Sequence, residues 1–94
     1  MIKVYLTGHL KDYTGNRREF KISNVPTVTE LIGMLNEMFP GIRDRIFDDH
    51  DETRPFVNIF VNGYNIRDGE KERTKLKDGD NVHILPSVAG GSNA

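Results

Sequence analysis

The segment from Thr27 to Gly41 gives the clearest structural signal in the chain. Residues 27–30 match a capping box, in which a threonine hydroxyl and a glutamate carboxylate satisfy free backbone N–H groups at a helix start. Apolar residues then recur at spacings of three and four, which predicts one buried stripe along about three turns. Pro40-Gly41 is expected to end the helix. The stripe consists of Val28, Leu31, Ile32, Leu35, Met38 and Phe39.

Two segments before this helix alternate as β-strands do. Every second residue is apolar in residues 2–7, the pattern of a strand with one buried face. Residues 8–16 contain two glycines and predict a loop that reverses the chain, and residues 18–22 alternate again. We therefore expect a β-hairpin whose second strand points Phe20 and Ile22 inward.

The remaining strands are predicted after the helix. Residues 56–61 are rich in β-branched and aromatic types, which favour a strand. Asn62-Gly63 is typical of a type I′ hairpin turn. The other expected segments are a short helical turn with Ile42, Ile46 and Phe47 buried, a polar loop over 48–55, a returning strand over 64–66, a solvated charged connection over 67–77 from which Leu76 reaches the core, and a last strand over 81–85.

This order of elements favours an α+β domain with one main helix packed on one face of a mixed sheet of four or five strands. A β-grasp (ubiquitin-like) arrangement satisfies it, with the first and last strands parallel at the centre and the helix as the crossover. That strand order comes from analogy, because periodicity does not encode it. We expect a domain over residues 1–86 and a flexible tail over residues 87–94.

Composition excludes several classes of function. The formal net charge is −1, so no broad positive field draws the 94-residue chain to nucleic acid or anionic lipid. There is no cysteine, which excludes disulfides, thiolate metal sites and a cysteine nucleophile. The N-terminal residues resemble neither a signal peptide nor a membrane span. We therefore expect a cytoplasmic protein that binds neither nucleic acid nor membrane.

Candidate catalytic and metal-binding side chains are sparse. The acidic run over residues 48–52 contains His50, but consecutive loop residues point in different directions, so we interpret it as a solvated loop and expect no metal site. His9, His50 and His83 are far apart in sequence, and no serine lies in a nucleophile motif. We expect no catalytic residue and no enzyme activity.

One face of the predicted sheet is a candidate partner-binding patch. If the apolar set of each strand faces the helix, alternation places an aromatic group on the other face, where no second helix is predicted to cover it. The alternatives are that loops fold over this face, or that a strand register is shifted by one residue. The patch consists of Tyr5, Phe56, Phe60, His83 and Leu85.

The sequence after the last strand ends in Val88-Ala89-Gly90-Gly91 and three further residues. A Gly-Gly pair with no following element cannot serve a hairpin or a helix end. Two residues without a Cβ can pass through a channel that is too narrow for side chains. The alternative is a frayed terminus rich in small residues.

These features together resemble a known family. The segment over residues 78–91, in which an Asp-Gly-Asp turn, a strand, a proline and Gly-Gly follow in order, resembles the end of the ubiquitin-like sulfur carriers. That family includes the molybdopterin synthase small subunit and the thiamine sulfur carrier. Residues 54–63 and 85–91 look most like the carrier of thiocarboxylate-dependent cysteine biosynthesis, with relatives in homocysteine and siderophore pathways. The resemblance covers nearly the whole chain.

The resemblance implies a mechanism. An E1-like adenylyltransferase, using ATP and Mg²⁺ that the carrier itself does not bind, would adenylate the α-carboxylate of Gly91. A sulfur donor would convert it to a thiocarboxylate, and a sulfur-accepting synthase, of which a pyridoxal-phosphate enzyme is one candidate, would consume it. The tail over residues 88–91 would enter the partner while the sheet face docks outside. A ubiquitin-like modifier or adaptor, joined or docked through the same tail and face, is the alternative.

The three residues after Gly91 depart from the simplest members of the family, because they hold its carboxylate in a peptide bond. Some relatives are matured by a JAMM-type zinc metallopeptidase, and the resemblance implies a cut between Gly91 and Ser92. A cloning remnant is the alternative source of Ser92-Asn93-Ala94. The pathway served stays open between cysteine, homocysteine, siderophore, molybdopterin and thiolated-tRNA routes.

Overall fold

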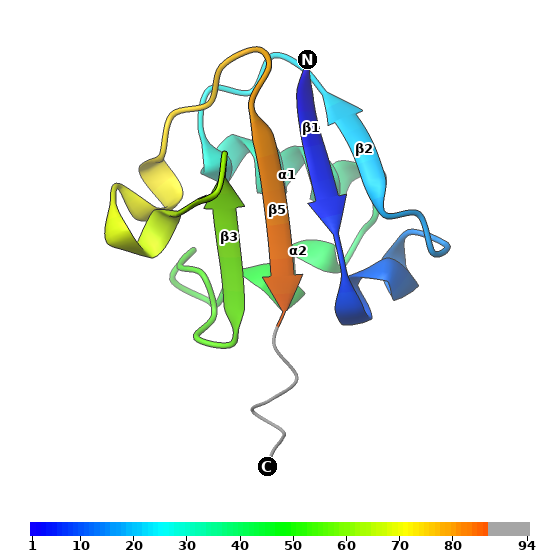
Figure 1. Cartoon of the computed structure of the whole chain (residues 1–94). Helices are drawn as coiled ribbons and strands as arrows, with labels where there is room; N and C mark the ends of the chain where they lie inside the picture. The colour runs from blue at the N-terminus through cyan, green and yellow to red at the C-terminus, as the bar shows by residue number, and fades with distance from the viewer. Residues whose placement is uncertain (87–94) are drawn as a thin grey trace.

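The structure, a computed structural model, describes residues 1–86 (Figure 1). They form a five-stranded sheet in the order β2-β1-β5-β3-β4. β1 and β5 are parallel, and the other neighbouring strands are antiparallel. The predicted α+β, β-grasp fold is therefore confirmed, with the first and last strands at its centre. The strands are β1 (Ile2–Leu6), β2 (Glu19–Ile22), β3 (Val57–Val61), β4 (Tyr64–Asn65) and β5 (Asn81–Pro86).

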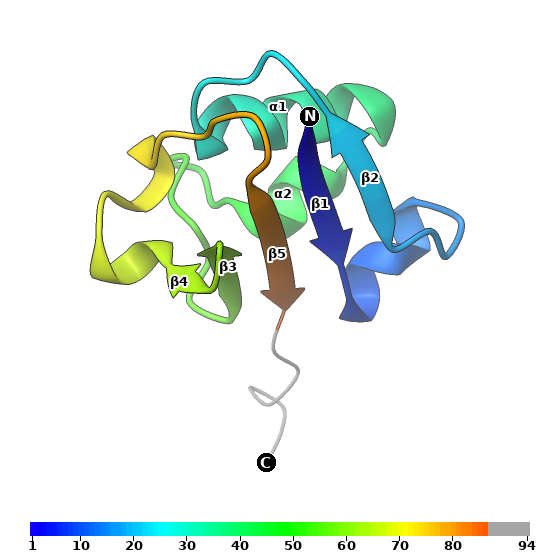
Figure 2. The same cartoon turned by 45° about the horizontal axis from the view of Figure 1, so that its top comes forward.

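Two α-helices lie on one face of this sheet, as Figure 2 shows. Parallel strands require a long crossover connection, and α1 (Val28–Met38) and α2 (Ile42–Ile46) lie within the one that joins β1 to β5. Residues 1–86 also contain three 3₁₀-helices. These are η1 (Gly8–Tyr13), η2 (Ile66–Asp68) and η3 (Lys71–Arg73).

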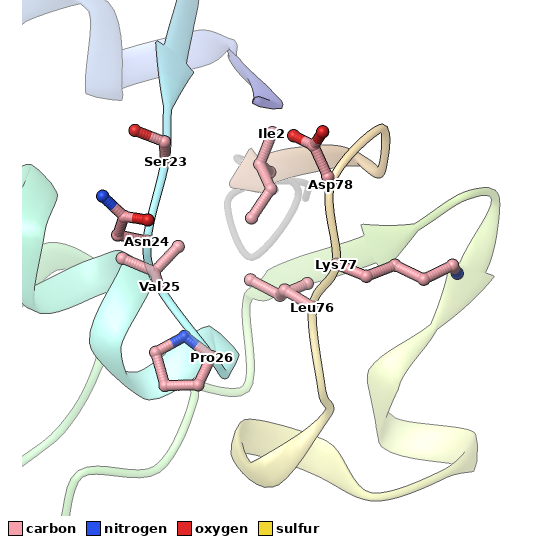
Figure 3. A pocket seen from close by; sticks show the side chains of 8 residues that line it. All are labelled: Ile2, Ser23, Asn24, Val25, Pro26, Leu76, Lys77 and Asp78. Carbon is pink, nitrogen blue, oxygen red and sulfur yellow. The ribbon is translucent and has the colours of Figure 1, made fainter.

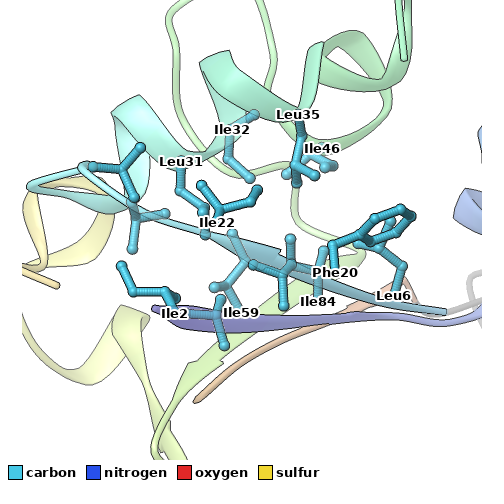
Figure 4. Packing of buried hydrophobic residues seen from close by; sticks show 14 of the residues in the cluster. Ile2, Leu6, Phe20, Ile22, Leu31, Ile32, Leu35, Ile46, Ile59 and Ile84 are labelled. Carbon is cyan, nitrogen blue, oxygen red and sulfur yellow. The ribbon is translucent and has the colours of Figure 1, made fainter. Parts of the chain in front are cut away.

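The hydrophobic core lies between the helices and the sheet (Figure 4). The inward residues of the three central strands are buried, and four residues of the α1 stripe have no exposed surface. Ile42 and Ile46 of α2, with Phe47 just after it, extend the same cluster, as predicted. Phe20 of β2 packs against Phe39, with ring centroids 5.1 Å apart. No helix among residues 1–86 is long and apolar enough to span a bilayer.

The start of α1 differs from the predicted capping box. The helix begins at Val28, as expected, but the Thr27 hydroxyl donates to the Glu30 carboxylate and makes no bond to a backbone N–H. Instead, the Val28 N–H donates to the carbonyl oxygen of Thr74 at 3.1 Å. A distant segment therefore satisfies the helix end, and the two side chains pair with each other.

Met38 was expected in the buried stripe, but 44% of it is exposed. At 100° per residue, Met38 lies roughly 80° around the helix axis from Val28, farther than any other stripe residue. The predicted stripe was therefore too wide by one residue at its C-terminal end.

Three loop expectations also need correction. The loop over residues 8–16 contains η1, which buries Leu10 in the core. The returning strand is only two residues long, because Ile66 turns inward, is buried and begins η2. The connection over residues 67–77 contains η3 rather than being uniformly solvated, although Leu76 reaches the core as predicted. In η1 and η2 one buried apolar side chain, too isolated to give a period, accompanies the local helix, whereas η3 has no buried residue.

Substituting two residues of α1 tests this packing. Leu35→Ala removes a fully buried side chain and should lower the free energy of unfolding by about 2–5 kcal/mol. Met38→Ala, on the same helix but largely exposed, should change it by less than about 1 kcal/mol. Urea unfolding followed by circular dichroism measures both values. Equal losses would contradict the observed placement of the helix.

Candidate docking face

The uncovered face of the sheet carries a row of rings across its three central strands. The register pairs Tyr5 of β1 with His83 of β5, and His83 with Phe60 of β3. Directly paired residues point to the same side of a sheet, and their neighbours Val4, Val82 and Val61 face the helices. The docking row, as we name Tyr5, His83 and Phe60, therefore faces away from the helices.

Two of the three rings of the docking row are in contact. Tyr5 and His83 stack with centroids 4.5 Å apart and planes 11° from parallel. All three residues are partly buried, and neither α1 nor α2 lies over them (Figure 2). Within residues 1–86 the row is thus a partly buried aromatic surface in which two of the three rings are stacked.

A polar clamp flanks the row on the β3 side. Leu85 pairs with Asn58, which accepts a hydrogen bond from Arg67 Nη1 at 2.6 Å. Arg67 Nη2 also donates to the backbone oxygen of Arg54 at 2.6 Å. Sequence reasoning missed Arg67, because a lone arginine in a charged stretch gives no signal of what it will contact.

The structure places Phe56 differently from the docking row. It lies in the turn before β3, is 47% exposed, and lines a hollow with residues of η1 and α2. Of the five residues predicted to form the patch, three form the row, Leu85 lies beside it and Phe56 borders this hollow.

The predicted reactive tail begins where β5 ends. β5 runs through Pro86, which is paired with Val57 at the edge of the described residues. Gly8 lies close to Pro86, because a Cβ at position 8 would be 3.0 Å from Pro86 Cγ. The two segments of the chain are therefore tightly packed at this point. The predicted tail residues Val88, Ala89, Gly90 and Gly91, and the predicted cleavage site at Ser92, lie outside the described residues.

An asparagine and an aspartate hold β5 against the β3-β4 hairpin. Asn62 and Gly63 both have positive φ, 53° and 84°, as the predicted type I′ turn requires. Asn62 Nδ2 donates to Asp80 Oδ1 at 2.9 Å, and Asn62 Oδ1 accepts the Asn81 N–H at 2.9 Å. The buried Asp80 carboxylate also accepts the Lys77 N–H at 2.9 Å. Burial raises the pKa of Asp80, but these hydrogen bonds outweigh it and lower the pKa overall.

The acidic run over residues 48–52 forms a turn rather than a metal site. In the acidic run, the Asp48 side chain accepts N–H bonds from His50 and Glu52 and closes its own turn. No group of three or more His, Asp or Glu residues within residues 1–86 is placed to hold a metal.

A hollow of about 620 Å³ lies near the start of β1 and β5, at the opposite end of the sheet from Pro86. Ile2, Val25 and Leu76 converge there (Figure 3).

Comparison with known proteins agrees with this architecture. The profile of the ThiS family matches residues 4–91. The chain belongs to the ThiS family. A ThiS-family relative in Archaeoglobus fulgidus, a putative sulfur carrier protein, is 42% identical over 65 residues, 69% of this chain and 74% of the relative. The sulfur carrier protein CysO of Mycobacterium tuberculosis is 36% identical over 84 residues, 87% and 89% of the two chains.

A solved structure extends the similarity to the ThiS-family fold. The crystal structure of the Amycolatopsis orientalis BexX/CysO complex contains a chain that is 30% identical to this one. The two superpose with a TM-score of 0.87, covering 97% of this chain and all of the other. The chain thus shares its fold with a structure that contains CysO, and its sequence with proteins named as sulfur carriers.

The hydrogen bonds to the buried Asp80 carboxylate predict a pH dependence of stability. The folded-state pKa of Asp80 lies below its unfolded value of about 3.9, so its stabilisation is present above that value and is lost as the pH falls through the folded pKa. Asp80→Asn should lower the free energy of unfolding by about 1–3 kcal/mol at pH 7 and flatten the loss below about pH 4.

The control is Asp49→Asn, which removes an exposed carboxylate of the acidic loop. Denaturant unfolding at a series of pH values compares the three proteins. A wild-type and an Asp80→Asn curve that stay parallel down to pH 2 would contradict the assignment.

Proposed function

We propose that this chain carries sulfur as a thiocarboxylate on Gly91, formed after residues 92–94 are removed. The observation that carries the proposal is the extent of the family match, which continues beyond β5 and ends at Gly91. The similarity thus includes both glycines and stops before Ser92-Asn93-Ala94. The sulfur carrier proteins of Archaeoglobus fulgidus and Mycobacterium tuberculosis support the same conclusion.

The proposed chemistry activates a carboxylate that is otherwise a poor electrophile. The Gly91 carboxylate attacks the α-phosphorus of ATP in an E1-like adenylyltransferase, and pyrophosphate leaves. Hydrosulfide supplied by a sulfur donor then attacks the acyl-adenylate carbonyl, AMP leaves with the bonding electrons, and a thiocarboxylate remains. ATP and Mg²⁺ belong to the activating enzyme, and the carrier supplies the reacting group, its reach and its recognition.

The carrier needs no catalytic side chain in this scheme, because each step takes place in a partner's active site. The slender Gly90-Gly91 pair can enter a channel, while the docking row contacts the enzyme outside it. The Amycolatopsis orientalis relative was crystallised in a complex with BexX, which supports docking of such a carrier onto a second protein. We place the reaction in the cytoplasm, where ATP is available.

Maturation is the first step we propose. A zinc metallopeptidase of the JAMM type cuts between Gly91 and Ser92 and frees the carboxylate. The sulfur of the thiocarboxylate then passes to a synthase that makes a sulfur metabolite, for which we propose cysteine or homocysteine.

Intact-mass spectrometry tests the proposal directly. The chain truncated after Gly91 should gain the mass difference between one oxygen and one sulfur when incubated with the activating enzyme, ATP and a sulfur donor. The full-length chain should stay unchanged until the peptidase removes Ser92-Asn93-Ala94. A Gly-Gly remnant on lysines of other proteins, without any thiocarboxylate, would instead establish the modifier alternative.

The docking row predicts a binding defect. Phe60→Ala removes one of its three rings and should raise the KM of the activating enzyme for the carrier about tenfold, with little change in kcat, since the reacting group is untouched. Tyr64→Ala is the matched control, because Tyr64 is 58% exposed on β4 and is not part of the row. Equal KM values for the two variants would show that the enzyme binds elsewhere.

A further inference from the structure

A hollow of about 480 Å³ lies at the end of the molecule where β5 finishes. Its lining comes from η1, from the start of α2 and from the turn before β3, at the lower end of the sheet in Figure 1. Val57 is paired with Pro86, so Phe56, one residue earlier, lies next to the point where the chain passes beyond Pro86. The lining residues are Tyr13, Gly41, Asp44, Arg45, Arg54 and Phe56.

Two arginines of this lining are held in place by their Nε atoms. Arg45 Nε donates to the Tyr13 hydroxyl oxygen at 2.7 Å, and Arg54 Nε donates to the backbone oxygen of Asp44 at 2.7 Å. Among residues 1–86, neither arginine makes an ion pair with a carboxylate. The terminal nitrogens of both guanidinium groups are therefore available to a ligand, and each group is already oriented.

The ring that orients Arg45 is itself fixed. Tyr13 packs against the core, and its ring lies over Gly41, where a Cβ would come within 3.3 Å of Tyr13 Cε2. Any other residue at 41 would displace this ring. The Arg45 guanidinium thus rests on a packed support, which reduces the entropy it would lose on binding.

The charges around the hollow are unbalanced in favour of the arginines. Asp44 is the single carboxylate of the lining, and its Oδ1 lies 3.7 Å from Arg43 Nη1. The Asp48 carboxylate is engaged by backbone N–H bonds from Glu52 and His50, which lower its pKa, with Arg54 contributing least. The exposed Phe56 ring adds an apolar wall, beside which an ion pair is partly shielded from water.

We propose that this hollow binds an acidic side chain of the enzyme that activates the tail. Two oriented guanidinium groups suit a carboxylate, which they can bind through paired N–H bonds. The hollow borders the root of the tail, so a partner that draws in Gly90-Gly91 must bring its channel rim to this surface. The inference rests on the proposed function, and it adds a second contact that is separate from the docking row.

The experiment measures steady-state activation of the chain truncated after Gly91 by the E1-like adenylyltransferase, through pyrophosphate release. The double variant Arg45→Gln/Arg54→Gln should raise KM for the carrier roughly tenfold and leave kcat unchanged. The wild-type KM should rise with ionic strength, and that of the double variant should rise much less. Arg73→Gln, which removes an exposed arginine of η3, is the matched control and should behave as wild type.

Two further variants separate geometry from folding. Arg45→Lys/Arg54→Lys keeps both charges without the planar fork, and should recover only part of the lost affinity. Arg45→Gln alone removes an exposed side chain and should melt like wild type, so a KM increase in this variant cannot come from unfolding. Full recovery by the lysine pair would overturn the paired-bond geometry.

The outcomes distinguish this inference from the function on which it rests. If the wild-type carrier is activated with the same KM as Arg45→Gln/Arg54→Gln and Arg45→Gln alone, the inference is overturned and the proposed function stays intact. A wild-type carrier that gives neither pyrophosphate release nor a thiocarboxylate overturns both.

Discussion

The parallel pairing of β1 with β5 is the constraint on which the rest of the molecule depends. Parallel neighbours cannot be joined by a tight turn, so the chain between them must cross over the sheet, and it does so with α1 and α2 on one face. The opposite face is left without a helix. The same pairing sets His83 beside Tyr5, and the neighbouring register sets it beside Phe60. One pairing thus creates both the covered core and the aromatic row.

Charged residues in the connections bind parts of the fold together rather than only facing solvent. The Glu72 carboxylate accepts both the N–H and the hydroxyl of Thr53, each at 2.7 Å, while its backbone oxygen accepts the Thr29 hydroxyl. Burial raises the pKa of Glu72, but the bonds from Thr53 outweigh this effect and lower it. Arg67 similarly joins η2 to β3 and to the turn before it. These contacts hold the loops around a small core.

The sequence predicted the features that follow from repeated patterns. Alternation in β1 and β5 and the spacing in α1 gave the core, and Asn62-Gly63 gave the hairpin turn. Sequence reasoning missed the features that depend on a single contact between residues far apart in sequence. The Thr74 oxygen that receives the Val28 N–H, and the bond between Arg45 and Tyr13, join segments far apart in sequence. No local sequence pattern encodes such long-range contacts, because they depend on the topology of the folded chain.

The central strand of the sheet is also the last of the described strands to be synthesised. Until β5 emerges from the ribosome, the β1-β2 hairpin and the β3-β4 hairpin have no strand to join them. Native closure of the sheet must therefore wait for it, since domains fold as units during synthesis. A nascent chain cannot assemble Tyr5, His83 and Phe60 into one surface before that moment.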